Sequence, residues 1–256
     1  QDDKESKKDD AKKEKSFEEG TKQSKLIEGL FDIYQDSISG KIQMLIKEEQ
    51  LNKDFIYGSQ IADGIVQAGG FRGLYNDEKI INFKKFFDKI EISFINTNFY
   101  FDKNNPLYKS REANISNAII SSSKIDFHDK ENGTYLINAN DLFLSESLTR
   151  VKPPSRPNQS RTAFSLGSLD KAKSKIMDIR NYPENLNIKT DYVYNNPNIL
   201  SSGSNSISDS RYVSMKAFHT LIEMPDEDYE IRLDDQRVGY FLTQVDNLTD
   251  SGTTNY

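Results

Sequence analysis

The amino-acid sequence predicts an α+β fold that is predominantly antiparallel β-sheet with a few short helices. Three observations support this prediction. Apolar and polar residues alternate over many short runs, turn-forming residues separate the runs, and Phe and Tyr, which favour strands, supply 15 and 13 of the 256 residues. A chain of this length can bury a substantial core, as one large domain or two small ones.

The first residues differ from the rest of the chain. Residues 1–16 contain six lysines, six acids and no large apolar side chain. Such a segment cannot bury enough apolar surface to fold, and its acids cancel the lysines that a membrane-binding arm would need. We therefore expect residues 1–22 to form a disordered polar tether and residues 23–245 to form the α+β domain.

Strand patterns begin after the tether. Ile33 leads through the turn "DSISGK" to Ile42, Met44 and Ile46, a spacing typical of a β-hairpin. The run "KEEQLNKDF" then predicts a short helical turn, and "FIYGSQIA" predicts another strand. The glycine cluster in "DGIVQAGGFRGLY" fits neither phosphate-binding pattern, because no Lys-Ser/Thr or helix-opening Gly-x-Gly-x-x-Gly is present. A flexible loop is the favoured interpretation.

The strongest alternation lies in residues 79–103, "KIINFKKFFDKIEISFINTNFYFDK", which predict two or three antiparallel strands. Residues 105–124 then fit a helix that starts at Asn105 and Pro106. The following "IDFHDKENGTYLINANDLFL" predicts a strand, an Asn-Gly turn, a second strand and a short helix around residues 142–144.

The last part of the chain alternates between loops and strands. Residues 150–163 hold three prolines and three arginines and predict a loop, where a boundary between two subdomains would fall. Ser168 is a candidate N-cap for a short helix in "SLDKAKSKIMDIRNYPEN". The runs "LNIKTDYVYNN" and "RYVSMKAFHTLIEMP" predict strands, with a Ser/Asn-rich loop at residues 196–209 between them.

Composition excludes several classes of protein. The net charge of −6, with Lys and Arg interleaved among acids, argues against a nucleic-acid partner. No apolar run approaches the roughly 20 residues that a membrane-spanning helix needs. The sequence has no cysteine, so disulfides, thiolate metal sites and cysteine nucleophiles are excluded.

The sequence offers no recognisable catalytic, cofactor-binding or metal-binding residues. Neither of its two histidines, His128 and His219, has a second histidine at helical spacing, and the zinc-peptidase motif His-Glu-x-x-His is absent. "SLGSL" lacks the second glycine of a nucleophile elbow. Asp234 and Asp235 are adjacent, so on a strand they would point to opposite faces, a poor geometry for paired carboxylate catalysis.

A resemblance to a known family rests on several blocks of sequence. The segment "EMPDEDYEIRLDDQRVGYF" at residues 223–241 is similar to a stretch that precedes the catalytic domain in large exported zinc-dependent metalloproteases of Gram-negative bacteria. The blocks "LIEGLFDIY", "KIQMLIKEEQLNKDFIYGSQIADG", "NTNFYFD", "DLFLSE" and "NYPENLNI" match, in order, the uncharacterised N-terminal domain of that family. The resemblance covers roughly residues 20–245.

The resemblance implies a modular protein. Residues 23–245 would be an accessory domain, and residues 246–256 a C-terminal tail that leads to a catalytic domain missing from this sequence. Zinc is expected only in that missing domain, so the resemblance assigns no cofactor to this chain. The expected partner is the downstream catalytic domain of the same polypeptide, and the expected location is the periplasm or the outer membrane.

Five residues near the end of the chain are candidates for a structural or interdomain role: Arg232, Asp235, Arg237, Gly239 and Tyr240. We expect the arginines and the aspartate to form a buried or half-buried ion network at the end of a strand, where an Arg fork held by a carboxylate fixes a corner. Gly239 would allow close backbone approach or a bulge. Contact with a substrate at the domain interface is the alternative role.

The sequence is compatible with two functions. The first is a non-catalytic N-terminal domain of an exported zinc-dependent metalloprotease, which scaffolds the catalytic domain or presents substrate to it. The alternative is a cell-envelope interaction subunit that docks onto an outer-membrane protein assembly without proteolysis. Fold analogy alone does not decide between them.

Overall fold

The fold is taken from a computed structural model that describes residues 17–152, 158, 160, 162–201, 203–225, 237 and 245–249. In chain order the strands are β1 (Ser24–Ile27), β2 (Ile33–Asp36), β3 (Ile42–Lys47), β4 (Asp54–Asp63), β5 (Tyr75–Phe86), β6 (Lys89–Ile95), β7 (Phe99–Tyr100), β8 (Ala118–Asp129), β9 (Thr134–Asn138), β10 (Ser168–Leu169), β11 (Lys175–Asn181), β12 (Asn185–Asn195), β13 (Tyr212–Glu223) and β14 (Asp246–Asn247). The helical pieces are α1 (Phe17–Thr21), α2 (Asn140–Phe143) and the 3₁₀ turns η1 (Glu48–Gln50), η2 (Val66–Ala68) and η3 (Pro106–Ser110).

Twelve of these strands form one sheet in the order β1-β2-β3-β9-β8-β6-β5-β4-β13-β12-β10, with β11 also paired to β12. Every pair in this sheet is antiparallel. The predominantly antiparallel sheet predicted from the sequence is therefore confirmed, and the described helices contain no more than five residues each. These helices are too short to cross a membrane.

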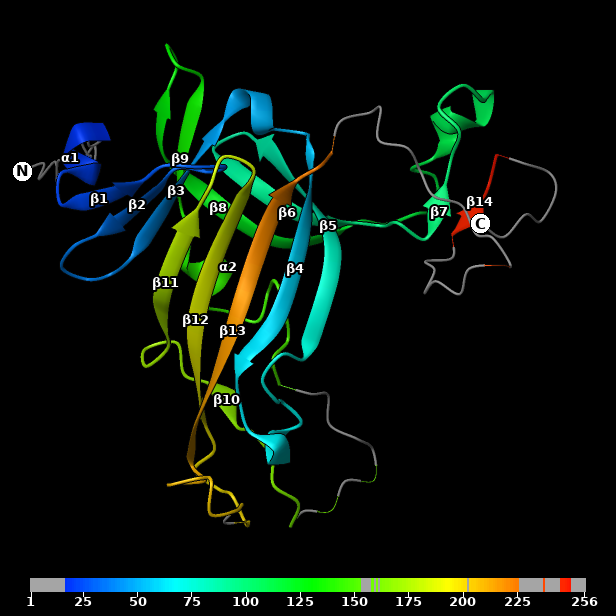
Figure 1. The fold of residues 1–256 in the computed structure, drawn as a ribbon. Coiled ribbons are helices and arrows are strands. Elements are labelled where there is room, and N and C mark those ends of the chain that lie inside the picture. The colour runs from blue at the N-terminus through cyan, green and yellow to red at the C-terminus, as the bar shows by residue number, and fades with distance from the viewer. Residues whose placement is uncertain are drawn as a thin grey trace, which may run out of the picture.

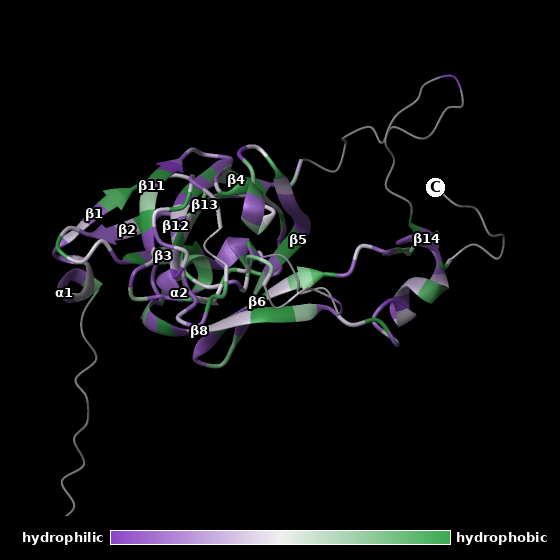
Figure 2. Ribbon diagram, turned by 90° about the horizontal axis from the view of Figure 1, so that it is seen from below, coloured by the Kyte–Doolittle hydropathy of each residue, from purple (hydrophilic) through white to green (hydrophobic). Residues whose placement is uncertain are grey.

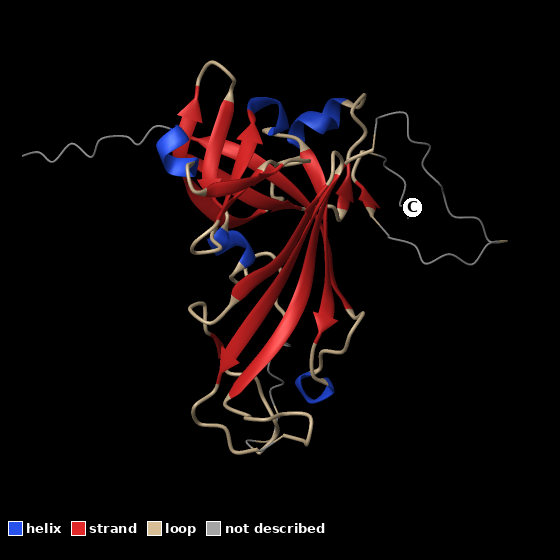
Figure 3. Ribbon diagram, turned by 60° about the vertical axis from the view of Figure 1, so that its left-hand side comes forward, coloured by secondary structure: helices blue, strands red, loops and turns tan. Residues whose placement is uncertain are grey.

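The large sheet curls into a half-barrel (Figures 1 and 3). Its two ends meet where the β1–β2 connection reaches the end of β11. The backbone N–H of Leu30 donates to the carbonyl of Tyr182 at 2.7 Å, and Asn181 Nδ2 donates to the carbonyls of Ile27 and Phe31 at 2.9 and 2.7 Å. These bonds, here called the seam, join segments about 150 residues apart in the sequence.

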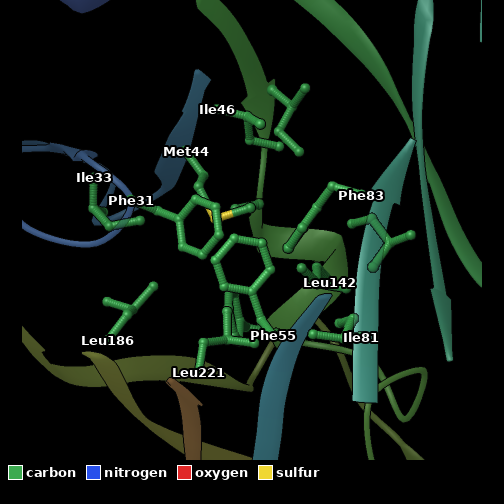
Figure 4. Packing of buried hydrophobic residues seen from close by; sticks show 14 of the residues in the cluster. Phe31, Ile33, Met44, Ile46, Phe55, Ile81, Phe83, Leu142, Leu186 and Leu221 are labelled. Atoms are coloured by element: carbon green, nitrogen blue, oxygen red, sulfur yellow. The ribbon is translucent and has the colours of Figure 1, made fainter. Parts of the chain in front are cut away.

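The main core fills the concave side of the half-barrel (Figure 4). At its centre Phe31, Phe55 and Phe83 lie with ring centroids 5.0 to 5.7 Å apart. They come from the β1–β2 connection, β4 and β5, and each is at most 1% exposed. Strand alternation explains the pattern, since Phe55 and Tyr57 of β4 and Leu186 and Ile188 of β12 point into this core from every second position.

A second apolar cluster lies farther along the long strands. Ile61, Tyr192, Val213 and Met215 form part of it. The glycine-rich loop predicted after β4 packs here, because Gly64 and Gly70 leave room for the Met215 side chain that any Cβ would displace. The loop interpretation is confirmed, and the glycines serve packing.

Most strands predicted from the sequence are present. The hairpin of β2 and β3, the long strands β4, β12 and β13, and the Asn-Gly turn between β8 and β9 all form as predicted. Gly133 in that turn has a φ of 59°, the left-handed conformation that the Asn-Gly pattern indicated. The short helix predicted around residues 142–144 is α2.

The helix predicted over residues 105–124 is wrong. Asn105 does cap a helical turn, since its Oδ1 accepts from Leu107 N at 3.0 Å, but η3 ends at Ser110. Asn114 has a φ of 61°, which breaks a right-handed helix. Residues from Ala118 onward instead form β8, which pairs with β6 and β9.

The helix predicted from Ser168 is also wrong. One helical turn forms, in which Ser174 N and Lys173 N donate to the carbonyl of Asp170. The alternation in "KIMDIRN" then pairs with β12 as strand β11. Sheet pairing outweighs the local capping signal at this position.

The third strand predicted within residues 79–103 forms but has a different partner. Phe99–Tyr100 pairs in parallel with β14 rather than antiparallel with its neighbours in sequence. Half of the predicted 150–163 loop, residues 153–157, 159 and 161, lies outside the described residues, as does the polar segment 1–16.

Candidate functional site

The five residues that the sequence singled out lie largely outside the described part of the chain. Arg232, Asp235, Gly239 and Tyr240 are not described. Arg237 is described at a turn and is exposed. The proposed ion network and the alternative substrate contact therefore both stay predictions.

The two histidines lie in very different surroundings. His128, at the end of β8, is exposed and stacks on Tyr135 with ring centroids 4.5 Å apart. His219, on β13, is 1% exposed. Its ring lies between Tyr57 of β4 and Tyr192 of β12, whose hydroxyls are 2.9 Å from Nδ1 and Nε2 respectively.

One set of proton positions satisfies the whole His219 cluster. The Tyr192 hydroxyl donates to the carbonyl of Phe143 at 2.6 Å, so it accepts from Nε2–H of His219. The Tyr57 hydroxyl then donates to Nδ1. Burial lowers the pKa of His219 from its ordinary 6.5 to about 3, so the ring is neutral at physiological pH. A neutral ring fits this set of bonds, with one nitrogen as donor and the other as acceptor.

The hydrogen bonds of the cluster continue into residues 143–152, here called the strap, which follows α2. The Tyr194 hydroxyl donates to Glu146 Oε1 at 3.0 Å, and burial together with this carboxylate raises the pKa of Tyr194. Thr149 is 2% exposed; its hydroxyl donates to Asp77 Oδ2 at 2.8 Å and accepts from Ser59 Oγ at 3.1 Å. The strap is thus fixed to β4, β5 and β12 by polar contacts.

This interior arrangement is suited to structural rigidity. His219 is enclosed on the described sides by Tyr57, Tyr192, Thr190 and Phe143, and its polar atoms are satisfied. Within the described segments, no group of three His, Cys, Asp or Glu side chains could hold a metal ion.

A separate feature stands away from the half-barrel (Figures 1 and 2). Residues 96–117, here called the arm, contain β7 and η3, and β14 pairs with β7. Asn105 Nδ2 donates to the carbonyl of Thr249 at 3.1 Å, and Asp102 N donates to Thr249 Oγ1 at 3.1 Å. The C-terminal described residues are therefore attached to the arm.

A groove of about 680 Å³ lies between the arm and the outer face of the sheet, and we call it the outer groove. Its floor is formed by outward-facing residues of β5, β6 and β8, together with the start of β4. Its wall is formed by the arm. The lining residues are Asn52, Asp54, Asn82, Lys84, Glu91, Ser93, Ile95, Asn96, Phe99, Phe101, Tyr108, Arg111, Glu112, Ile115, Asn117 and Ile119.

The wall of the groove presents aromatic and charged groups side by side. The Arg111 guanidinium lies over the Tyr108 ring, 4.5 Å from its centroid, and its Nη2 is 3.2 Å from Glu112 Oε1. On the floor, Asn82 Nδ2 donates to Asp54 Oδ1 at 2.8 Å. The amide side chains, aromatic rings and charges of both signs can hydrogen-bond an extended backbone and contact its side chains.

Sequence reasoning missed the groove. Tyr108, Arg111 and Glu112 fell in a segment interpreted as a helix, and the floor residues were treated only as the polar half of a strand pattern. The Asn105-Pro106 pair at the start of η3 was the one local signal for the arm, because it indicated that the succession of strands is interrupted there. The juxtaposition of arm and sheet depends on long-range packing that periodicity does not encode.

Comparisons with known proteins place the chain in one family. Residues 73–253 match a family described as a domain of unknown function, DUF5117. No curated protein and no solved structure matches the chain. The matched residues include the arm, the strap and His219. Strands β1 to β4 precede the matched residues, but β4 belongs to the same sheet, because it pairs with β5 and β13. Because the match extends over more than half of its residues, the chain belongs to the DUF5117 family.

Proposed function

We propose that the chain is a non-catalytic N-terminal domain of an exported zinc-dependent metalloprotease, and that it holds extended polypeptide in the outer groove for a downstream catalytic domain. The observation that supports this most is the groove itself. It combines three aromatic rings, amide side chains and charges of both signs along one open surface. The resemblance over residues 20–245 supplies the link to proteolysis.

The groove chemistry suits an extended chain better than a compact small molecule. Asn82, Asn96 and Asn117 offer amide groups that can pair with backbone N–H and C=O groups. Tyr108, Phe99 and Phe101 provide the aromatic contacts that dominate binding energy in protein interfaces. Arg111 and Glu112 lie on the same wall, so Arg111 can form ion pairs with acidic side chains of a bound polypeptide and Glu112 with basic ones.

Zinc enters this proposal through the resemblance alone. Zinc in a catalytic domain would polarise the scissile carbonyl and activate a water molecule. The described residues of this chain contribute no such ligand set. Their part is to bind and orient the substrate, which lowers the entropic cost of bringing a flexible polypeptide to the catalytic centre.

A binding assay tests the groove. Fluorescently labelled, unfolded casein is the probe, and the purified chain is titrated against it by anisotropy. Tyr108→Ala should weaken binding by about 5-fold or more, because an aromatic anchor in a groove contributes more than its neighbours. Tyr75→Ala removes a tyrosine that is 75% exposed and lies outside the groove, so it serves as the matched control.

The outcomes separate the hypotheses. Loss of binding in Y108A with wild-type affinity in Y75A supports the groove as the binding surface. Equal affinity in both variants, with thermal unfolding unchanged, contradicts it. Absence of casein binding by the wild-type chain would contradict the proposal that the domain holds extended polypeptide.

A further inference from the structure

The hairpin between β5 and β6 ends in two exposed aromatic side chains. Phe86, the last residue of β5, is 54% exposed, and Phe87 in the turn is 80% exposed. Their rings contact each other edge to face, with centroids 4.8 Å apart. Together they form an apolar projection, here called the Phe86–Phe87 tip.

The backbone at the tip is unfavourable for the residue it holds. Phe87 has a φ of 50°, in the left-handed region that glycine and asparagine adopt and that a bulky side chain rarely does. A glycine at this position would relieve the strain, and the exposed ring adds little to the core. Because the strained conformation of Phe87 does not contribute to folding, it indicates that the ring contacts another molecule.

Lysines surround the tip. Lys84 and Lys85 precede it, Lys89 pairs across the hairpin with Phe86, and Lys124 of β8 lies beside Lys89. Among the described residues none of these four ammonium groups forms an ion pair within 4.0 Å, and Lys85 lies over the Tyr135 ring.

The acids near the tip offset part of this charge. Residues 84–89 contain one acid, Asp88, and Glu91 lies across from Lys84. The four lysines with these two acids leave a local excess of positive charge, although the whole chain has a net charge of −6. The lysines are therefore concentrated where the exposed rings are.

Two exposed rings beside four lysines that have no ion-pair partner among the described residues are complementary to the surface of a bilayer that contains anionic lipids. Phenyl rings partition into the boundary between headgroups and acyl chains, and ammonium groups bind the lipid phosphates. We propose that the Phe86–Phe87 tip is a peripheral docking site for an anionic membrane surface. The two rings of the tip lie outside the outer groove, with which the tip shares only Lys84, and membrane docking does not require proteolysis.

Vesicle flotation with the full chain tests the proposal. Vesicles of phosphatidylcholine containing about one third phosphatidylglycerol are compared with vesicles of phosphatidylcholine alone, at low and at high salt. The double variant Phe86→Ser/Phe87→Asn should reduce binding to the anionic vesicles by about 10-fold or more. Asn tolerates the left-handed turn, so this variant should fold.

Two further variants complete the design. Lys89→Gln/Lys124→Gln should weaken binding by about 5-fold per lysine and reduce its salt dependence. Phe71→Ser is the control. Phe71 is 53% exposed in the loop that precedes the first residue of β5, whereas the tip is at the last residue of that strand, so binding should be unchanged.

Three results would overturn the proposal. They are absence of binding to anionic vesicles, equal binding to both vesicle types, and wild-type binding by the double aromatic variant. Capture of a protein by the tip in the absence of vesicle binding would assign it to a protein partner instead. Failure of any of these tests leaves the casein assay unaffected, so the two proposals are judged separately.

Discussion

His219 illustrates how a polar residue can be buried at the centre of a sheet when both of its ring nitrogens have hydrogen-bond partners. Each ring nitrogen has a tyrosine hydroxyl as its partner, and burial holds the pKa near 3. The sequence predicts a strand over the segment that contains His219 and offers no second histidine at the spacing of a zinc site. Its partners could not be predicted, because Tyr57 is 162 residues away in the chain.

The lowered pKa of His219 makes stability depend on pH. The unfolded chain binds a proton below about pH 6.5, whereas the folded chain does not until about pH 3. The stabilisation is therefore complete above pH 6.5 and is lost as pH falls toward 3. Between pH 7.5 and pH 5 this group should lower the free energy of unfolding by about 2 kcal/mol.

Urea unfolding at several pH values checks this prediction. The His219→Gln variant should be less stable than wild type at neutral pH. Between pH 7.5 and pH 5, however, it should not show the loss of about 2 kcal/mol in the free energy of unfolding that His219 causes in wild type. His128→Gln, which removes an exposed histidine, is the control. An identical pH dependence in wild type and H219Q would contradict the neutral, buried ring.

At the scale of elements, strands were more predictable than helices, of which the short α2 and the turn η1 formed as predicted and two longer ones did not. Alternation identified β2 to β6, β9, β12 and β13 because one face of each is buried. The two false helices arose from real local signals, the cap at Asn105 and the turn at Asp170. Each signal produced one turn, after which pairing with a neighbouring strand determined the structure.

The alternation on β5 gives a direct test of which face is buried. Phe83 points into the aromatic centre of the core and is 0% exposed, whereas Phe86 lies at the exposed tip. Phe83→Ala should lower the free energy of unfolding by about 3–5 kcal/mol, because it leaves a cavity. Phe86→Ala should change it by less than about 0.5 kcal/mol.

Denaturant unfolding of the two alanine variants measures both effects. Similar losses of stability in F83A and F86A would contradict the core described here, since only the first ring contacts Phe31 and Phe55.

At the scale of the molecule, neither the curvature of the sheet nor the outer groove could be predicted from the sequence. Both depend on contacts between distant segments, such as Asn181 with Phe31 at the seam and the arm with the outer face. Asn181 was part of a segment assigned to a helix, and its two donated bonds become evident only when the sheet curls. Composition and periodicity specify the strands but not how the ends of a sheet meet.

Asn181→Ala should loosen the seam. The carbonyls of Ile27 and Phe31 would lose their donor, at a cost of about 1–3 kcal/mol. Hydrogen exchange of β1 and β2 should become faster, with little change in β12 and β13. Asn132→Ala, which removes a hydrogen bond to Asp129 within one exposed turn, is the control. Unchanged hydrogen exchange of β1 and β2 in N181A would contradict the role of Asn181 in the seam.

We propose that this domain works beside a zinc catalytic domain on the same polypeptide. The most direct test is to isolate the native protein with an antibody against this chain and to measure its intact mass and zinc content together. We predict a species much heavier than 29.4 kDa that contains zinc and cleaves casein. A native species that contains this chain but neither zinc nor proteolytic activity would contradict the claim.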